Sequence, residues 1–554
     1  MKTRFLWVSL VVVSAVHVFA QAESGSRVEK LRPHFMLGVG SAPGDGWIEE
    51  TRKNGCRWDV RYQYICGGVN TPSNWKTWNQ PAGAFLSLYL NESEKMGCIP
   101  CVTYYQLLQS LPAAGKGAED VVNKTNGENG ATMKAYFDDY KVLLQKCSEF
   151  GKPVIVHHEP DLWGYFLISQ QFAPNEADKV KVIVKSSGHP DVAEFEDTAA
   201  GFGKAIVAMR DKYAPQVLLA WHASKWGNPD VNKFVAFLKQ CGKWDLLFTD
   251  PSDRDSAWKI AKNYHAGGAW WTDADFNSFR DWSAELHKAT KLPLMAWQIP
   301  MGNTVFASCN NTDGHYMDNR PEYWLENYPQ NTHIAEYAAA GYIGLLFGGG
   351  AGACTNCRDV YKDGVTNPEP VKGNKGEKSA WPDDDGGYLR LRGGNYYTKG
   401  PLLFKQQNKA AVVAAPAPKP VEAPKITVNE KLLAEYQGKL IQRVNELAKA
   451  GKKPSVFLRL TDKQEKFNVR SADEKELTIE VQGNPMPVSW KKIEMRDRVA
   501  LAKANASEED AEAMMLVAVL LCADGDVSAA QEFLAKAALK DADKAAAVKT
   551  ALGL

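Results

Sequence analysis

The chain has 554 residues, of which 45% are hydrophobic, and its formal net charge is +1 at pH 7. This length and apolar content allow a sizeable core and two or more domains. The nearly balanced charge gives no electrostatic reason to expect a nucleic acid or an anionic membrane surface as partner.

The N-terminus has the three parts of a secretory signal peptide. Lys2 and Arg4 precede an apolar run over residues 5–19, and the small residues Ala20 and Ala22 follow it. The run is short for a membrane-spanning helix, which needs about 20 apolar residues, and no other stretch approaches that length. We therefore expect residues 1–22 to be a signal peptide and the protein to be secreted or periplasmic, without stable membrane insertion. An uncleaved anchor is the alternative.

Residues 34–347 alternate between apolar runs and amphipathic segments. The runs predicted to be strands are 34–41, 57–65, 99–106, 153–159, 217–222, 244–250, 293–298 and 342–347. The helices predicted between them are 84–96, 133–150, 199–212, 231–240, 276–288 and 332–340. Strands that alternate with helices favour parallel pairing, and eight such units in about 320 residues fit a (β/α)8 TIM barrel, an α/β fold. An open doubly wound sheet is the alternative, but no GxGxxG follows the first strand.

A long loop and a last helix are predicted to complete the barrel. Residues 348–381 are rich in Gly, Asn and Lys, and the segment 383–403 is expected to contain the last helix. We therefore place the barrel at residues 30–405. Residues 406–425 form a Pro/Ala-rich linker, because alternating Pro and Ala cannot build a packed core.

Residues 426–554 are predicted to form a small α+β accessory domain. An amphipathic helix is expected over residues 430–450, short strands at 455–460, 467–471 and 476–482, a turn at residues 483–484, and Ala-rich helices from about residue 507. No cluster of reactive side chains lies here. A stabilising or interaction role, with a protein partner as one form of it, is expected.

The chain has ten cysteines, which fit an oxidising compartment. Cys98 and Cys101 form one CxxC pair, and Cys354 and Cys357 form another. No Cys/His pair has zinc-finger spacing, so disulfides or buried thiols are favoured over a metal site. The chain is expected to need no metal and no cofactor.

The segment VIVHHEPDLWGY, residues 154–165, carries the densest group of polar side chains at a predicted strand end. Side chains alternate along a strand, so His157, Glu159 and Asp161 are expected to face the mouth of the barrel, with His158 on the other side. Ligands bind at this end of parallel α/β barrels.

Other predicted strands bring polar and aromatic groups to the same end. The second strand has Asp59, Arg61 and Gln63 at alternate positions, as a polar row along the barrel interior. For Asp59 and Arg61, a buried ion pair that lines the barrel and a functional role are equally favoured. Further strand-end residues are Tyr105, Gln106, His222, Trp226, Asp250, Trp297 and Gln298.

Carboxylates beside Trp and Tyr rings at a barrel mouth indicate glycoside hydrolysis, in which one carboxylic acid protonates the leaving oxygen and a second carboxylate attacks or activates water. Glu159 is the predicted acid/base, because nearby apolar rings should raise its pKa. Asp250 and Asp161 lead as the second carboxylate, followed by Asp253 and Asp318. Residues expected to bind the carbohydrate are Asp59, Tyr105, Gln106, His157, Trp163, His222, Trp226, Trp297 and Gln298.

The VIVHHEPDLWGY segment and the order of eight strands resemble the (β/α)8 glycoside hydrolases of the clan that places its acid/base Glu at the end of the fourth strand. The resemblance covers about residues 30–405, and Glu159 matches that acid/base position. His158 stands where the clan has Asn, and Gln298, in AWQIP, stands where it has its nucleophile Glu. The resemblance thus implies a glycosidase whose second carboxylate comes from elsewhere, such as Asp250 or Asp161.

Two further hypotheses remain open. A non-catalytic glycan-binding or surface-interaction protein would explain Gln298. A metal-dependent hydrolase would draw ligands from His157, His158, Glu159, His222, Asp250 and His315. It is disfavoured, because adjacent His residues on a strand face opposite ways and no HxH or HExxH is present.

Overall fold

The computed structural model describes residues 27–168, 176–227, 230–350, 352–364, 367–404, 428–452, 454–459, 464–481, 483–507 and 510–554. The chain divides into two compact units, Met1–Gln406 and Gln407–Leu554. The predicted signal peptide, residues 1–22, and the predicted linker, residues 406–425, lie outside the described residues.

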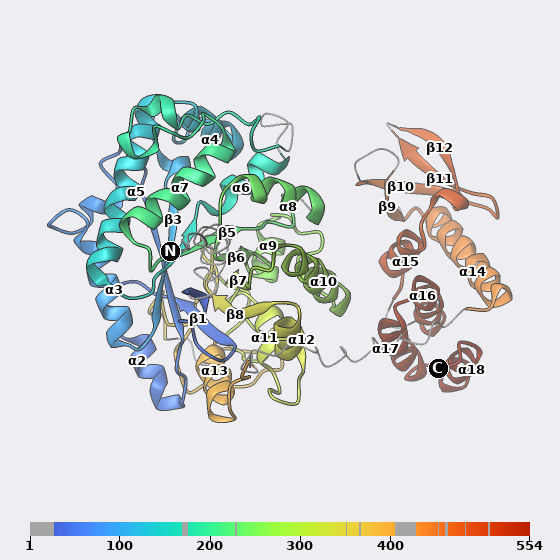
Figure 1. Cartoon of the computed structure of the whole chain (residues 1–554). Coiled ribbons are helices and arrows are strands. Elements are labelled where there is room, and N and C mark those ends of the chain that lie inside the picture. The colour runs from blue at the N-terminus through green and yellow to red at the C-terminus, as the bar shows by residue number, and fades with distance from the viewer. Residues whose placement is uncertain are drawn as a thin grey trace, which may run out of the picture. The chain divides into compact units, whose positions relative to one another are not determined.

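The first unit is a closed barrel of eight parallel strands in sequence order, with helices around it (Figure 1), as the sequence predicts. Its strands are β1 (Met36–Gly40), β2 (Val60–Cys66), β3 (Ile99–Tyr105), β4 (Ile155–His158), β5 (Leu218–His222), β6 (Leu246–Thr249), β7 (Leu294–Ile299) and β8 (Tyr342–Phe347). β1 pairs with β8, with Met36 opposite Gly344, and this pairing closes the barrel.

The helices of the first unit fall between and after the strands. They are α2 (Trp47–Thr51), α3 (Ala84–Lys95), α4 (Glu119–Gly127), α5 (Gly130–Phe150), α6 (Pro160–Ile168), α7 (Ala199–Tyr213), α8 (Val231–Gln240), α9 (Ser256–Ala261), α10 (Asp273–Thr290), α11 (Arg320–Leu325), α12 (His333–Ala339) and α13 (Tyr388–Thr398). Each predicted helix of the barrel is present. α6 begins directly after β4 at Pro160, a residue that suits the first turn of a helix because it has no N–H to satisfy.

Apolar side chains form two layers, one inside the barrel and one between the strands and the helices. The interior cluster consists of Met36, Val60, Tyr62, Ile99, Cys101, Ile155, Leu218, Ala220, Leu246, Phe248, Met295, Trp297 and Leu346. The outer layer contains the alternate residues of the same strands, among them Val156 and Trp221. The barrel is therefore a packed core and not a pore, as expected for eight strands.

The face assignment predicted for β2 is wrong. Val60 and Tyr62 lie in the barrel interior, so Arg61 points outward to α3. There its guanidinium pairs with Glu92 (Nη2–Oε2 3.2 Å) and lies over the ring of Tyr89, 4.8 Å from the centroid. Side chains alternate, so the polar row of this strand belongs to the barrel–helix layer and not to the interior.

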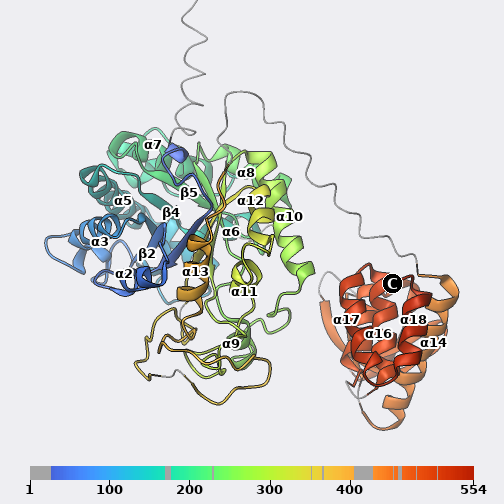
Figure 2. The ribbon, with the colours of Figure 1, turned by 90° about the horizontal axis from the view of Figure 1, so that it is seen from below.

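The segments after β7 and β8 pack on each other beside α9 (Figure 2). The backbone N–H of Gly314 donates to Ala353 O at 2.8 Å, and the side-chain amide of Asn303 donates to Asp385 O at 2.7 Å. The N–H of Ala257, in α9, donates to Met317 O at 3.1 Å. Both long segments are thus ordered by hydrogen bonds that also fix α9 beside the barrel.

The second unit combines an antiparallel sheet, in the order β12-β11-β10-β9, with helices. Its elements are α14 (Glu430–Lys449), β9 (Ser455–Arg459), β10 (Gln464–Ala472), β11 (Glu476–Val481), β12 (Asn484–Ser489), α15 (Met495–Ala504), α16 (Ala511–Asp524), α17 (Val527–Ala538) and α18 (Ala542–Ala551). β12 is a fourth strand that the sequence did not predict. Its Pro485 and Pro487 hide it from a strand pattern, but an edge strand tolerates proline because one side of it has no ladder.

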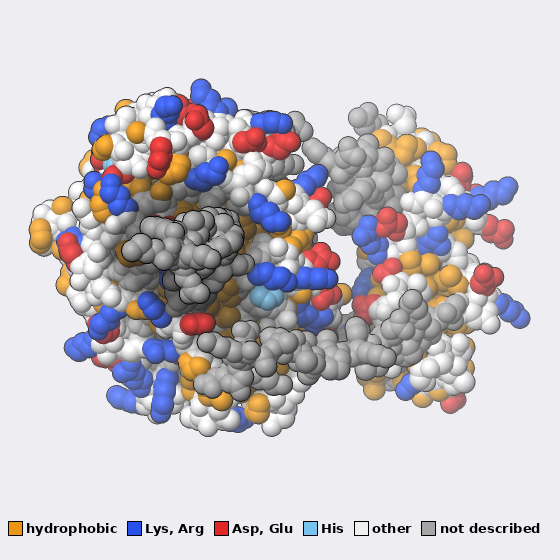
Figure 3. All heavy atoms as spheres, in the orientation of Figure 1, with side chains coloured by type: hydrophobic (Ala, Val, Ile, Leu, Met, Phe, Trp, Pro, Cys, Tyr) orange, Lys and Arg blue, Asp and Glu red, His pale blue; other side chains and the backbone are white. Residues whose placement is uncertain are grey.

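On the face that Figure 3 draws, side chains of both signs are scattered over the surface, with several Lys and Arg gathered at the lower left. In the part of the chain that the structure describes, no helix is both long and apolar enough to span a membrane. All ten cysteines are free thiols; Cys66 is partly exposed and the other nine are buried.

Candidate active site

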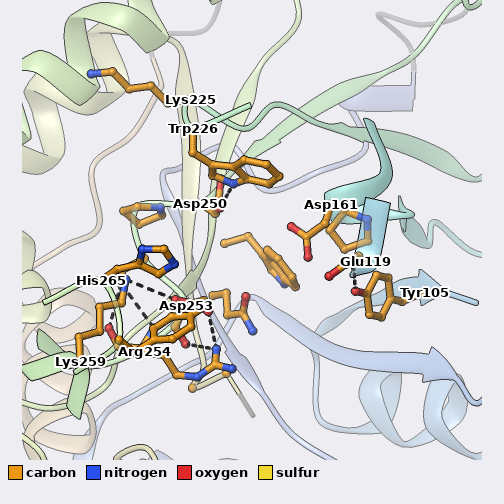
Figure 4. Close-up of a pocket in the computed structure, with 18 of the residues that line it drawn as sticks. Tyr105, Glu119, Asp161, Lys225, Trp226, Asp250, Asp253, Arg254, Lys259 and His265 are labelled. Atoms are coloured by element: carbon orange, nitrogen blue, oxygen red, sulfur yellow. Dashed lines mark hydrogen bonds and ion pairs between the residues drawn. The ribbon is translucent and has the colours of Figure 1, made fainter. Parts of the chain in front are cut away.

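A cavity of about 1110 Å³ opens at the C-terminal ends of the barrel strands (Figure 4). Strand ends, α4, α6, α9 and the loops after β5, β6 and β8 all contribute to its wall. The described residues that line it are Tyr64, Cys66, Tyr105, Gln109, Glu119, Pro160, Asp161, Tyr165, Lys225, Trp226, Asp250, Pro251, Ser252, Asp253, Arg254, Lys259, Tyr264, His265, Trp271, Phe279, Trp297, Gln298, Gly349 and Gly350. The cavity is large enough for a ligand of several rings.

Asp161, in the first turn of α6, points into this cavity. Burial raises the pKa of its carboxyl to about 7, and His222 opposes the rise, whereas Glu119, Asp250 and Asp253 add to it. A carboxyl with this pKa is largely protonated below neutrality and can give up its proton near pH 7. It has the properties that a general acid needs.

Asp250 follows β6, and each of its oxygens faces a side-chain nitrogen. Trp226 Nε1 donates to Oδ2 at 3.2 Å, and His222 Nε2 lies 3.2 Å from Oδ1. Indole N–H groups only donate, so Oδ2 of Asp250 is an acceptor. The hydrogen bond from Trp226 orients the carboxylate in the cavity wall, whereas the approach of His222 lacks hydrogen-bond geometry.

The histidine beside Asp250 belongs to a chain of polar contacts through the barrel interior. His222 Nδ1 lies 3.0 Å from His157 Nε2, and His157 Nδ1 lies 3.4 Å from Thr103 Oγ1. Burial, with His222 and His158 adding, lowers the pKa of His157, so this ring is neutral. One proton arrangement satisfies the chain: Thr103 donates to His157, which donates to His222. The Nε2–H of His222 then faces Asp250.

Glu119 is a third carboxyl in the cavity, from the first residue of α4. Its Oε1 accepts a hydrogen bond from Tyr105 OH at 2.7 Å, and burial raises its pKa. Figure 4 shows it beside Asp161. Sequence reasoning missed Glu119, because it considered strand ends and this residue enters from a helix far along the loop after β3.

Aromatic rings form much of the remaining wall. Trp226 is 46% exposed and packs edge-on against Tyr165, with 5.4 Å between ring centroids. Trp297 lies at the end of β7, with 5.9 Å between its ring centroid and that of Tyr64. Gln298 donates from Nε2 to Tyr64 OH at 3.1 Å. Flat rings of this kind stack on the apolar faces of sugar rings.

Glu159 does not reach the cavity. β4 ends at His158, and Glu159 takes a positive φ of 42°, so the strand alternation used to place its side chain stops one residue earlier. Its Oε1 accepts the backbone N–H groups of Gln106 (3.1 Å) and Leu107 (3.2 Å), and its side chain is 1% exposed. Burial raises its pKa to about 8. This direction agrees with the sequence prediction, but the carboxyl is turned into the wall behind the cavity.

Several residues expected to bind carbohydrate are placed elsewhere. Trp163 is fully buried and stacks on Trp221 with 3.7 Å between ring centroids, in the layer under the helices. Gln106 and His157 are also fully buried and do not line the cavity, and the same is true of His222. The predicted residues that do line it are Tyr105, Asp161, Trp226, Asp250, Trp297 and Gln298.

Asp59 lies at the opposite end of the barrel. It precedes the first residue of β2, where its Oδ2 accepts from the N–H of Leu37 (3.2 Å) and from Tyr397 OH (2.6 Å). His34 Nε2 lies 3.0 Å from its other oxygen. Asp59 therefore ties β1 and α13 to the start of β2, and its place among the carbohydrate-binding residues is corrected to a structural one.

Of the two carboxylates ranked after Asp250 and Asp161, one lines the cavity and the other does not. Asp253 lines the cavity and pairs with Arg254 (2.6 Å). Asp318 is buried, pairs with Arg320 Nη1 at 2.8 Å and accepts the Ser256 N–H at the start of α9. The described residues contain no group of three His, Cys, Asp or Glu side chains that could hold a metal ion.

Comparison with known proteins gives a distant structural similarity. No protein-family model matches the sequence, and no curated protein matches it. The solved structures it resembles include a GH5-4 broad specificity endoglucanase from Clostridum cellulovorans, with 12% identity, a TM-score of 0.33 and coverage of 67% of this chain and 96% of that one. They also include trehalose-6-phosphate hydrolase of Bacillus licheniformis, with 12% identity, a TM-score of 0.32 and coverage of 81% and 90%. The site must therefore be argued from its own residues.

Proposed function

We propose that the barrel is a glycoside hydrolase that cleaves glycosidic bonds in a polysaccharide or oligosaccharide. The observation that carries the proposal is that Asp161 and Asp250 line one cavity in different environments. Asp161 is half-buried with a raised pKa, and Asp250 accepts a hydrogen bond from Trp226 and lies 3.2 Å from His222 Nε2. Two carboxyl groups set apart in this way can divide the roles of acid and of base or nucleophile.

Asp161 acts as the general acid in this proposal. Its protonated carboxyl donates to the glycosidic oxygen as the bond to the anomeric carbon breaks, which avoids an unstable alkoxide leaving group. Asp161 takes the role that the sequence suggested for Glu159, because Asp161 lines the cavity and Glu159 does not.

Asp250 is the second carboxylate. It either attacks the anomeric carbon or takes a proton from the attacking water, and in both cases its charge stabilises the oxocarbenium-like transition state. The hydrogen bond from Trp226 holds its Oδ2 in place during this step, and His222 lies beside its Oδ1. The aromatic wall, with Trp226 and Trp297, supplies stacking surface for the sugar rings.

The test is hydrolysis by the purified full chain across a polysaccharide panel, with product anomers followed by NMR. Asp161→Asn and Asp250→Asn should each lower kcat by about 100- to 10,000-fold, the usual contribution of a positioned acid or base. Glu149→Gln is the matched control, since this carboxylate lies exposed on α5, does not line the cavity, and pairs with Lys146. Hydrolysis that survives both cavity substitutions would refute the assignment.

A non-catalytic glycan-binding barrel is the second candidate, and Gln298 favours it. An amide lines the wall at the end of β7, where the resemblance implies a nucleophilic carboxylate. Glycan binding by the wild type without turnover of any panel member would select this function over hydrolysis.

We also propose that the protein is exported after removal of residues 1–22 and that residues 426–554 serve as an accessory domain, joined to the barrel by residues 406–425. The N-terminal pattern of charged, apolar and small residues supports export. N-terminal sequencing of the mature protein would test it, because an intact Met1 would contradict cleavage.

A further inference from the structure

One side of the cavity carries basic side chains that the proposed chemistry does not use. Figure 4 shows Arg254, Lys259 and His265 across the cavity from Asp161 and Glu119. A further lysine, Lys225, lines the wall after β5. A cavity that only stacked and cleaved neutral sugars would have no need of these charges.

Arg254 is built firmly into the wall. Its Nη1 donates to Asp253 Oδ2 at 2.6 Å, and its guanidinium lies 5.4 Å from the ring centroid of Trp258. Gly350 leaves the room that it needs, because a Cβ there would come within 1.9 Å of Nη1. The Nε of Arg254 is buried and has no hydrogen-bond partner among the described residues. A buried, unpartnered donor of this kind points to a missing acceptor.

The basic side has more positive than negative charge. Asp253 is shared by two cations, since Lys259 Nζ lies 3.4 Å from its Oδ1 while Arg254 holds Oδ2. Lys225 Nζ bonds to the carbonyl and the hydroxyl of Ser278, and burial lowers its pKa against the opposing effect of Asp275 and Asp281. One carboxylate, Asp253, thus faces two cations, Arg254 and Lys259, so an anion in the cavity would complete the set.

We propose that this side of the cavity binds an anionic substituent of the glycan, the carboxylate of a uronic acid residue. The proposal rests on the glycosidase function proposed above and specifies its substrate class. Arg254 and Lys259 are the residues that bind the carboxylate.

The guanidinium group of Arg254 suits a carboxylate better than a compact ammonium group would. Guanidinium groups are planar forks that bind carboxylates through parallel N–H donors, and such charge-assisted bonds are stronger than neutral ones. Asp161 and Glu119 lie on the other side, and their raised pKa values reduce their repulsion of an acidic sugar.

Binding to matched pairs of oligosaccharides tests the proposal. The probes are galacturonate, glucuronate and mannuronate oligosaccharides, each with its carboxyl-reduced neutral counterpart, and a sulfated galactan oligosaccharide. The full chain with Asp161→Asn is titrated by calorimetry, so that cleavage does not intervene. We expect one acidic probe to bind about 10- to 100-fold more tightly than its reduced counterpart. Added NaCl should weaken this binding.

Variants assign the effect to the basic side. In the same background, Arg254→Gln and Lys259→Gln should each lower the affinity for the acidic probe far more than the affinity for its neutral counterpart, and so remove most of the preference. Lys262→Gln is the control, since Lys262 follows α9 on the surface and pairs with Asp313. Circular dichroism checks that each variant is folded. If Arg254→Gln does not fold, Lys259→Gln still tests the proposal.

Each outcome decides the proposal. Equal affinity within every pair, or no binding of any acidic probe, overturns it. Tight binding of the sulfated probe alone overturns the carboxylate in favour of a sulfate ester. Hydrolysis of neutral glycans without acidic preference leaves the glycosidase function intact and removes this inference. Preferential binding of an acidic probe without turnover by the wild type supports this inference and removes the glycosidase function.

Discussion

Asp161→Asn should make the protein inactive and, at alkaline pH, more stable. Burial raises the pKa of Asp161 to about 7 in the folded protein, whereas an Asp in an unfolded chain has a pKa of about 3.9. Between these values the folded state holds a proton that the unfolded state has lost. The free energy of unfolding therefore falls as the pH rises from about 4 to about 7.

The size of this cost follows from the two pKa values. A difference of about 3 pH units corresponds to about 4 kcal/mol as a ceiling, reached above pH 7. The cavity admits solvent, which screens the charge, so we expect about 1–3 kcal/mol. Asn has nearly the same shape as a protonated Asp and cannot ionise, so Asp161→Asn should remove the cost at pH 8 and change little at pH 4.

Urea denaturation of the wild type and Asp161→Asn at pH 4, 6 and 8 measures this difference directly, because other titrating groups cancel between the two proteins. Glu149→Gln, an exposed substitution, should show no such pH dependence. An Asp161→Asn variant that is equally stable at pH 4 and pH 8 relative to the wild type would refute the raised pKa. It would also remove the argument for a general acid.

Three further outcomes are expected. Glu159→Gln should keep hydrolysis within a few-fold, because this carboxyl lies behind the cavity and its pKa of about 8 already keeps it protonated near neutrality; a 100-fold loss in a folded variant would restore Glu159 as the acid. His222→Phe should lower kcat about 10- to 100-fold with little change in KM, because Asp250 loses the polar neighbour of its Oδ1, and His222→Gln should recover part of the loss; a change in KM alone would argue against this role. Trp163→Ala should lower the free energy of unfolding, measured by urea denaturation, by about 3–5 kcal/mol without a specific loss of glycan affinity. Trp226→Ala should weaken glycan binding about 3- to 10-fold by calorimetry and leave the free energy of unfolding nearly unchanged.

The barrel could be predicted from the sequence because each of its strands is a short apolar run between turn residues. The run at residues 342–347 matches β8 at both ends, and the other predicted strands agree within about two or three residues. The position of Asp250 after β6 also follows from this pattern, since the C-terminal ends of parallel strands meet on one face.

Side-chain direction at the strand ends could not be predicted in the same way. Alternation gave the wrong face for Arg61, because a sequence shows the period of a strand but not which set of side chains faces the core. It also failed at Glu159, where a positive φ follows the last residue of β4. Glu119 and Lys259 reach the cavity from helices, so no strand pattern could place them.

The thiols give the cavity a chemical handle. Cys66, at the end of β2, lines the wall and is partly exposed, while the other nine cysteines are buried. Burial raises its pKa to about 11, so alkylating reagents react slowly at neutral pH and faster as the pH rises. In the folded protein such a reagent should label Cys66 first, and a bound glycan should shield it. The rate of alkylation would then report occupancy of the cavity for ligands that are never cleaved.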